Sequence, residues 1–253
     1  MLLIEPEPTS FDLHFRLFGV HVRVHPFFWL CSAFLGWDYL KQGEGGLQLF
    51  LIWMVCVFVS ILLHELGHVF AGRLFGARGH IVLYSFGGLA IGSSELQNRW
   101  QRVFVYFAGP LIQFLLFGVV FALLVLKRNE ELAVPPVLAR TLVILAAINL
   151  FWPILNLLPI WPLDGGRISY EVFDWLMPSK GIRVALGISL VLAGLLAAHS
   201  LAAEFGQRLI PYVPVGGWIA ALLFALLALR SFQQLQMETY RRPWDRERDP
   251  WES

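Results

Sequence analysis

The stretch of this sequence best suited to chemistry is His64-Glu65-Leu66-Gly67-His68. Two histidines four residues apart lie on one face of a helix, one turn from each other. Their ring nitrogens can bind a single metal ion while the glutamate beside them serves as a base, and this His-Glu-x-x-His pattern is typical of zinc sites. A polar cluster that satisfies its own hydrogen bonds between packed helices is the alternative interpretation.

The motif lies inside an apolar run, Leu47 to Phe75, that is long enough to cross a bilayer. Charged groups inside a membrane span are costly and mark functional sites. Of the 253 residues 57% are hydrophobic and only 15% are charged, whereas soluble domains carry about 25% charged residues. We therefore predict an all-α polytopic membrane protein with about six transmembrane helices.

Polar turns and prolines separate the predicted membrane spans. The spans cover about residues 27–40, 47–72, 101–126, 138–158, 183–203 and 215–236. In the third of them, Ala108-Gly109-Pro110 either kinks the helix or lets a neighbour approach closely. We expect one transmembrane domain, residues 1–240, that carries the candidate zinc site, followed by a charged cytoplasmic tail, residues 241–253.

Three segments outside the spans have regular patterns of their own. Partial alternation of apolar and polar residues from Phe15 to His25 predicts a short strand. Residues 80–91 are β-branched and aromatic around Gly87-Gly88, which predicts a small membrane-associated hairpin or an edge strand with a glycine bend. A short amphipathic helix is expected over residues 167–177.

The fourth span leads into a segment that cannot continue as a helix, because Pro159 and Pro162 interrupt it. Broken backbone at membrane depth is tolerated only inside protein or beside a wet cavity. This segment carries one carboxylate, Asp164, followed by a glycine pair. A catalytic zinc takes three protein ligands and keeps a fourth position for water, so Asp164 is the candidate for the third ligand. Capping of the next helix is its alternative role.

The distribution of Lys and Arg sets the predicted orientation. With six spans, 14 of the 19 basic residues fall on the side that holds both chain ends. We expect a multi-pass protein of the cell membrane with both termini in the cytoplasm. The motif then lies near the cytoplasmic end of the second span, and Asp164 emerges on the same side. The Lys and Arg count thus predicts the same membrane depth for the His motif and for Asp164 without reference to either motif. This agreement favours one zinc ion per chain, with Glu65 as the base that activates water.

These residues resemble a known family. His64-Glu-Leu-Gly-His68 followed by Asn156-x-x-Pro-x-x-x-Leu-Asp164-Gly is similar to the site-2 protease family of intramembrane zinc metalloproteases. Three further segments are similar to that family: Phe18 to Pro26, Gly87-Gly88 and Ala108-Gly109-Pro110. Together these segments extend the resemblance over about residues 16–175. The arrangement is most similar to the compact six-span prokaryotic branch that includes sporulation-factor processing proteases.

The resemblance implies roles for individual residues. His64, His68 and Asp164 would be the zinc ligands and Glu65 the catalytic base, while Asn156 would hold the substrate backbone near the metal. A transmembrane segment must be unwound before hydrolysis, and an edge strand containing Gly87 and Gly88 could pair with the unwound stretch. A structural hairpin that plugs the helix bundle is the alternative interpretation of those glycines.

Regulation and partners are less constrained. Some members of that branch carry a C-terminal nucleotide-binding domain, and this sequence has only the short tail at that place. There is also no room for a PDZ domain between the spans. We therefore expect neither kind of regulation. The acidic N-terminal residues predict no cleaved signal peptide. The net charge of +1 indicates no nucleic-acid partner. A transmembrane protein substrate and the bilayer are the expected partners, while a membrane regulator, a homo-oligomer and the identity of the substrate stay open.

Two other classes of function use similar residues. A non-catalytic membrane metal-binding or scaffold protein would keep the histidines and Asp164, but it would not need Glu65. A haem-binding bundle would place histidine pairs on facing helices, and no such pair is evident. The two cysteines, Cys31 and Cys56, lie inside apolar runs and indicate neither a disulfide framework nor a cysteine zinc site.

Overall fold

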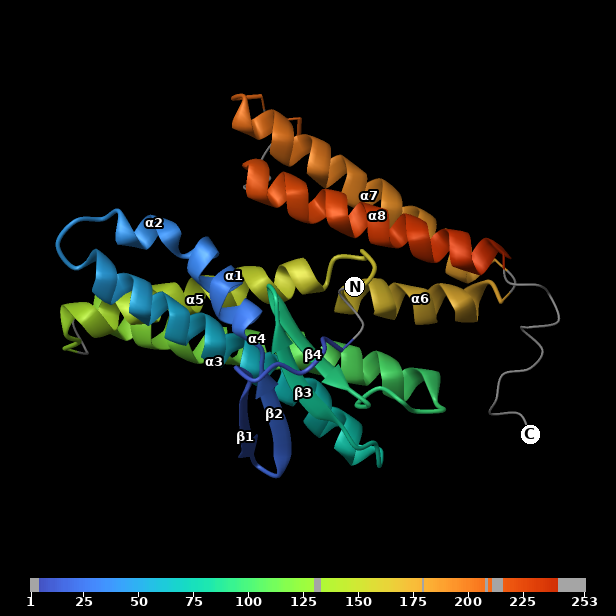
Figure 1. Cartoon of the computed structure of the whole chain (residues 1–253), viewed down its shortest axis with the longest axis horizontal. Coiled ribbons are helices and arrows are strands. Elements are labelled where there is room, and N and C mark those ends of the chain that lie inside the picture. The colour runs from blue at the N-terminus through green and yellow to red at the C-terminus, as the bar shows by residue number, and fades with distance from the viewer. Residues whose placement is uncertain (1–4, 130–132, 179, 208, 211–215, 241–253) are drawn as a thin grey trace. The chain divides into compact units, whose positions relative to one another are not determined.

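The computed structural model describes residues 5–129, 133–178, 180–207, 209–210 and 216–240. It is mostly helical, and the described chain divides into two compact units, Met1–Leu155 and Asn156–Ser253 (Figure 1). Five helices in the described ranges are long and apolar enough to cross a membrane. The expected charged tail, residues 241–253, lies outside the described residues.

Three of these spanning helices belong to the first unit: α3 (Gly46–Leu74), α4 (Arg99–Arg128) and α5 (Pro136–Asn156). They agree with the predicted spans within a few residues. Helix α3 continues unbroken through the metal-binding motif, so the two histidines lie one turn apart as predicted. The motif is therefore held by a long apolar helix rather than by a loop.

The first predicted span, residues 27–40, forms two short helices, α1 (Pro26–Leu35) and α2 (Trp37–Leu40). Neither reaches the roughly 20 residues that a span needs. The helix breaks at Gly36, where a Cβ would collide with the ring of Trp53 on α3. The indole Nε1 of Trp53 donates a hydrogen bond to the carbonyl oxygen of Ser32, 2.9 Å away. Gly36 thus lets Trp53 pack against the junction between the two short helices.

A four-stranded sheet completes the first unit, in the order β1-β2-β3-β4. The strands are β1 (Leu13–Leu17), β2 (Val20–Val24), β3 (His80–Tyr84) and β4 (Gly87–Ile91). The single strand predicted between Phe15 and His25 is a hairpin, because Phe18 and Gly19 adopt left-handed φ angles of 48° and 72° and reverse the chain. The hairpin predicted over residues 80–91 is present, with the glycine pair at the start of β4 rather than in the turn.

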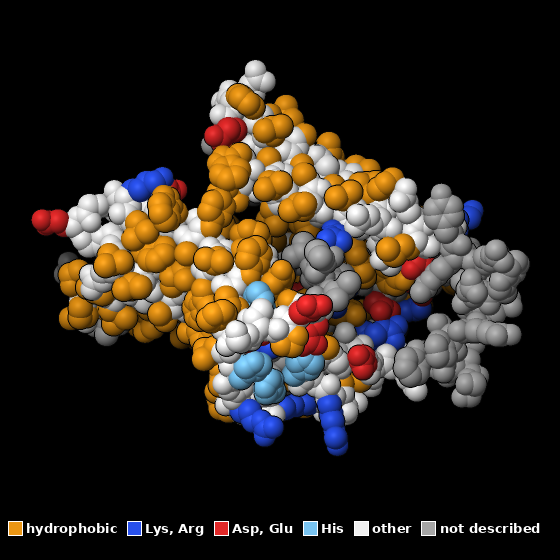
Figure 2. Space-filling model, viewed as in Figure 1, with side chains coloured by type: hydrophobic (Ala, Val, Ile, Leu, Met, Phe, Trp, Pro, Cys, Tyr) orange, Lys and Arg blue, Asp and Glu red, His pale blue; other side chains and the backbone are white. Residues whose placement is uncertain are grey.

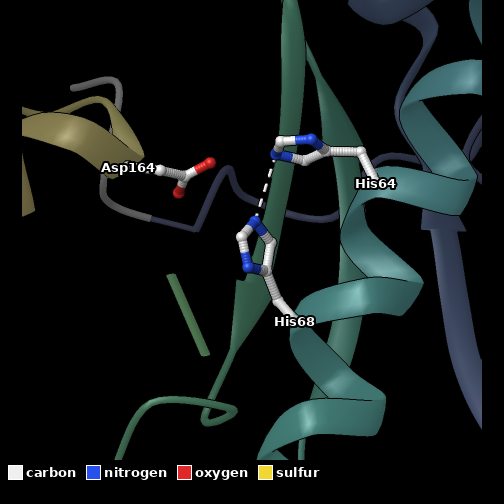
Figure 3. Close-up of side chains that lie close together, drawn as sticks. All are labelled: His64, His68 and Asp164. Atoms are coloured by element: carbon white, nitrogen blue, oxygen red, sulfur yellow. Dashed lines mark hydrogen bonds between the residues drawn. The ribbon is translucent and has the colours of Figure 1, made fainter. Parts of the chain in front are cut away.

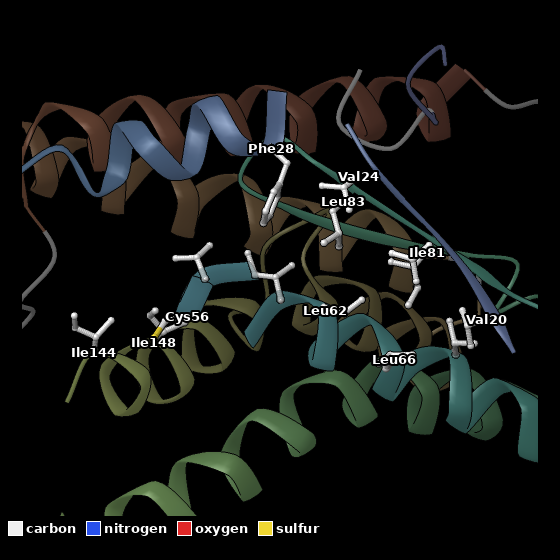
Figure 4. Packing of buried hydrophobic residues seen from close by; sticks show 14 residues of the cluster. Val20, Val24, Phe28, Cys56, Leu62, Leu66, Ile81, Leu83, Ile144 and Ile148 are labelled. Atoms are coloured by element: carbon white, nitrogen blue, oxygen red, sulfur yellow. The ribbon is translucent and has the colours of Figure 1, made fainter. Parts of the chain in front are cut away.

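The buried core of the first unit lies between the sheet and α3. Alternation along the strands directs one set of side chains towards the helix. This set packs against apolar residues of α3, and α5 closes the cluster from another side (Figure 4). The members labelled from the sheet are Val20, Val24, Ile81 and Leu83, those from α3 are Cys56, Leu62 and Leu66, and those from α5 are Ile144 and Ile148. This packing fixes the strands next to the motif helix.

The second unit contains α6 (Asp164–Leu176), α7 (Gly181–Glu204) and α8 (Trp218–Tyr240). Helices α7 and α8 are long enough to span a membrane and lie side by side (Figure 1). Ser189 on α7 accepts a hydrogen bond from the Trp161 amide at 2.6 Å, and Ser231 on α8 donates one to the Trp161 carbonyl oxygen at 3.2 Å. These bonds satisfy the backbone of the broken segment that precedes α6.

Hydrophobic side chains cover much of the face seen in Figure 2. Large apolar residues of the spanning helices are exposed, including Leu115 at 63%, Val119 at 61% and Val191 at 61%. Exposure of such apolar side chains to water is unfavourable, whereas their contact with lipid is not. The protein is an integral membrane protein.

Candidate active site

Helix α3 holds His64, Glu65 and His68 in the interior of the first unit. Their exposed fractions are only 4%, 5% and 5%. Close packing of α4 against the motif produces this burial, because a Cβ at Gly67 would lie 2.7 Å from the carbonyl oxygen of Ala108. The glycine of the motif therefore lets the two backbones approach, as small residues do between membrane helices.

Both imidazoles are oriented through their Nδ1 atoms. The Nδ1 atom of His68 lies 2.7 Å from the backbone carbonyl oxygen of Val105, and that of His64 lies 2.9 Å from the Oε1 atom of Gln113. A carbonyl oxygen only accepts hydrogen bonds, so each Nδ1 carries the proton and donates it. In the neutral rings the protons are therefore absent from both Nε2 atoms.

The two Nε2 atoms face each other at 3.1 Å (Figure 3). With both protons on Nδ1, neither Nε2 is a donor, and two lone pairs at this distance repel each other unless a cation lies between them. In a tetrahedral site with zinc–nitrogen bonds of about 2.0–2.1 Å, two nitrogen ligands lie about 3.3 Å apart. The histidine pair therefore fits one zinc ion, and the outer hydrogen bonds are of the kind that orients metal ligands.

Helix α4 leaves space beside these nitrogens at Gly109. A Cβ at this position would touch the Nε2 atom of His68 and lie 2.5 Å from its Cε1 and 3.0 Å from the Nε2 of His64. Only glycine leaves this space open. The close approach predicted from Ala108-Gly109-Pro110 is present, and its consequence is room for a ligand at the imidazole pair.

The strand β4 passes directly over the Glu65 side chain. A Cβ at Gly88 would touch the Cγ atom of Glu65 and lie 2.7 Å from its Cδ and Oε1 atoms. A Cβ at Gly87 would meet nothing within 4 Å. The two predicted glycines therefore differ. Only glycine fits at position 88 because of the contact with Glu65, whereas the position of a Cβ at Gly87 is open space.

Asp164 belongs to the second unit, which begins at Asn156, directly after the last residue of the first unit. Asp164 is the first residue of α6, where the partial positive charge of a helix N-terminus favours a carboxylate. A Cβ on either of the next two glycines would collide with the backbone of residues 157–161, so the pair lets α6 fold tightly against the segment before it. Asn156 is the last residue of α5 and is half-buried.

Residues 52–132 and 130–197 match the sequence profile of peptidase family M50. The chain belongs to this family. It is 32% identical to a putative zinc metalloprotease of Synechocystis over 67% of this chain and 46% of that protein. It is 30% identical to stage IV sporulation protein FB of Bacillus subtilis over 87% of this chain and 67% of that protein.

The fold is similar to that of the site-2 protease from Methanocaldococcus jannaschii, with a TM-score of 0.58. That comparison covers 88% of this chain and 94% of the other at 20% identity. A zinc metalloprotease of the same organism is 28% identical over 73% of this chain and 54% of that protein. The chain spans about half to two thirds of the length of the curated relatives it matches. The resemblance to the site-2 protease family is confirmed, and the histidine geometry agrees with the zinc chemistry of the M50 family.

Three buried polar residues that form a hydrogen-bonded chain leading to His64 were not predicted from the sequence: Ser60, Gln113 and Asn149. All three have no exposed surface. Gln113 donates from Nε2 to the Ser60 carbonyl oxygen at 3.4 Å, and Asn149 donates to the Ser60 hydroxyl at 2.8 Å. The first of these bonds turns Oε1 of Gln113 towards His64. Amide side chains inside apolar spans were the signal that could have revealed them, because such groups are costly unless they have a role.

Proposed function

We propose that this M50 protein is an intramembrane zinc metalloprotease that hydrolyses a peptide bond in or near the transmembrane segment of a membrane-protein substrate. Such a reaction is the cutting step of regulated intramembrane proteolysis. One observation carries the proposal: the Nε2 atoms of His64 and His68 face each other at 3.1 Å, inside a span-length helix and next to Glu65.

Asp164 is the third ligand in this proposal. Its carboxylate is a zinc-binding group, and with the two histidines it would complete the three-ligand set of a catalytic site. Two features support the assignment. The residue lies at the start of a helix where the backbone favours the ionised carboxylate, and the Lys and Arg bias puts it on the same side of the membrane as the motif.

The remaining roles follow from the side chains. Bound zinc lowers the pKa of a water ligand to about 7 and polarises a carbonyl group. Glu65 accepts the proton of the attacking water and passes it to the nitrogen that leaves the scissile bond. The Asn156 amide donates a hydrogen bond to the carbonyl oxygen on which charge develops.

The strand β4 is the proposed place for the substrate backbone. It is the last strand of the sheet, and β3 is its only neighbour among the described residues. A transmembrane helix satisfies its own backbone groups, so its peptide bonds become reachable only after unwinding. Strand addition to β4 would pair the unwound stretch and hold it beside Glu65, because Gly88 places this backbone against the carboxylate.

The proposed topology has both termini in the cytoplasm of a cell-membrane protein. Residues 26–40, which form α1 and α2, act as the first crossing in this proposal, and the five long helices supply the others. A helical segment of that length extends about 22 Å, so the bilayer must thin locally or the segment must rely on its protein neighbours. A membrane regulator or a second copy of the chain is compatible with this arrangement.

Replacement of Glu65 by glutamine tests the function. The purified Glu65→Gln protein should hold one zinc ion per chain, and cleavage of a co-expressed membrane substrate should fall by at least about 100-fold, because removal of a positioned base costs roughly that much. Undiminished cleavage would overturn the hydrolase mechanism. A non-catalytic metal-binding or scaffold protein would show no cleavage even with the native glutamate.

The third ligand has its own test. Asp164→Asn should lower the zinc content, whereas Asp174→Asn on the same helix should leave it unchanged. A full zinc complement in the Asp164 variant would remove this residue from the site without contradicting the hydrolase function.

A further inference from the structure

A basic hollow of about 580 Å³ lies where the β1–β2 hairpin meets the C-terminal end of α3. We use this name for the space lined by Arg16, Gly19, His21, Arg73, Gly76, Ala77, Arg78 and Gly79. Three arginines and a histidine thus face it, and no Asp or Glu is among its lining residues. The hollow is separate from the histidine pair and has no role in the proposed reaction.

Strand alternation places several arginine and histidine side chains on one face of the sheet. Arg16 pairs with His21 across β1 and β2, and His14 with Arg23 in the next pair on the same face, while the valines of β2 point to the core. Figure 2 shows histidine and basic side chains collected on this part of the surface. The three guanidinium groups that line the hollow carry like charges, which repel each other and therefore favour a bound anion.

The acidic groups nearby are already engaged. Arg23 is paired with Glu5 at 2.8 Å and with Asp12 at 3.0 Å, and Glu5 also lies 3.5 Å from the His80 ring. Within the described chain, no acidic side chain pairs with Arg16 or Arg78. Among these residues, no carboxylate therefore neutralises the two arginines of the basic hollow.

The wall of the hollow is preorganised by Arg73. Its guanidinium group donates to the carbonyl oxygens of Phe18 and Gly19, at 3.1 Å and 2.8 Å. Both carbonyls belong to the left-handed turn between β1 and β2, so the turn and the arginine hold each other in place. A fixed arginine loses less conformational entropy when it binds an anion than a mobile one.

The pKa of His21 lies below the ordinary value of a histidine. Partial loss of water around the ring lowers this pKa, and the neighbouring His14, His80, Arg16 and Arg23 lower it further. An anion in the hollow would oppose both effects, because it stabilises the protonated ring.

Exposed apolar side chains border the hollow. The rings of Phe18 and Phe70 lie 6.3 Å apart, with Phe18 exposed by 73% and Leu74 at the end of α3 by 76%. The 29 residues of α3 extend about 44 Å, longer than the hydrocarbon core of about 30 Å, and Arg73 in the last turn favours the headgroup region for this end of the helix. A molecule that meets this surface needs an anionic head and an apolar tail.

We propose that the basic hollow binds the phosphate group of an anionic membrane lipid, whose acyl chain lies against Phe18 and Leu74. The lipid would bridge the β1–β2 hairpin and the end of α3. Because the same sheet carries β4, the lipid would stabilise the sheet on the motif helix. A free phosphate or phosphorylated metabolite shares the headgroup chemistry but lacks the acyl chain, so the two sources can be separated.

The test uses the full chain purified in neutral detergent and mixed with equal amounts of phosphatidylglycerol and phosphatidylcholine. Native mass spectrometry should show retention of phosphatidylglycerol in preference to phosphatidylcholine. Arg16→Gln/Arg78→Gln should reduce that preference roughly 30-fold, since each arginine near an anionic headgroup contributes about fivefold. Lys127→Gln/Arg128→Gln, at the end of α4, removes the same charge elsewhere and should retain the preference. Equal loss in both double variants, or no preference in the native protein, would overturn the proposal.

Two further arms keep the result interpretable. Zinc content measured on each variant shows whether the fold around the motif is intact. The single variant Arg78→Glu, which breaks no hydrogen bond of the described chain, should also abolish the preference for phosphatidylglycerol. Titration of the native protein with inorganic phosphate separates the sources. Phosphate that binds as tightly as phosphatidylglycerol would contradict the lipid assignment.

Discussion

Replacement of Gly109 by alanine should remove zinc from the protein. The added methyl group would contact the Nε2 atom of His68 and lie 3.0 Å from that of His64. A metal ion shared by these atoms must lie about 2.0 Å from each, and carbon atoms prefer contacts of about 3.5–4.0 Å. The methyl group and the ion therefore compete for one space.

The magnitude follows from what must move. To make room, an imidazole must rotate away from its Nδ1 acceptor, and loss of such outer bonds alone lowers metal affinity about 10- to 100-fold. Since Gly109→Ala displaces the ligand atoms themselves, we expect a loss of at least about 100-fold. The fold should survive: overpacking costs about 1–3 kcal/mol, and alanine regains about 1 kcal/mol of helix propensity over glycine.

Metal analysis of the purified protein tests this prediction, with a competing chelator to measure the zinc affinity. Gly118→Ala is the matched control, because it makes the same substitution on α4 where a Cβ meets nothing within 4 Å. The control should keep one zinc ion per chain and full activity. A Gly109→Ala protein with unchanged zinc affinity would refute the position assigned to the metal.

Three other perturbations follow from the same structure. Gly88→Ala should slow cleavage and leave zinc bound, since its methyl group displaces Glu65, whereas Gly87→Ala should match the native protein in a cleavage assay. Gln113→Leu should lower zinc affinity about 10- to 100-fold in a chelator titration, because it removes the acceptor that orients one imidazole. Burial raises the pKa of Asp12, but hydrogen bonds from a threonine and a buried arginine hold it below its ordinary value. Asp12→Asn should therefore lower the melting temperature at neutral pH, and the difference should vanish as pH falls through the native pKa, because the stabilisation exists only while the carboxylate is ionised.

The local part of the site could be predicted from the sequence. The spacing of His64 and His68 needs only a continuous helix, and α3 provides it. Hydropathy located the five long helices, because a bilayer demands lengths and compositions that are visible without tertiary information. The break that carries Asp164 was visible for a similar reason, since prolines interrupt a helix whatever surrounds them.

Tertiary contacts account for what the sequence did not reveal. A tryptophan of α3 packs against the junction at Gly36, and Gln113 acquires its role only when α4 packs beside the histidines. The turn between β1 and β2 was missed because Phe18 rarely adopts a left-handed φ and gives no local signal. Hydropathy marks which residues are apolar but does not show which helices meet.

The measurement that tests the central claim most directly is mass spectrometry of the products formed from a membrane substrate in water enriched with heavy oxygen. The protein should cut within or at the edge of the transmembrane segment, and the new carboxyl end should carry one heavy oxygen atom, because water is the nucleophile. The Glu65→Gln protein, with its zinc retained, should form no such product. A cut in a water-soluble domain of the substrate, or an identical product from the glutamine variant, would contradict intramembrane hydrolysis by this site.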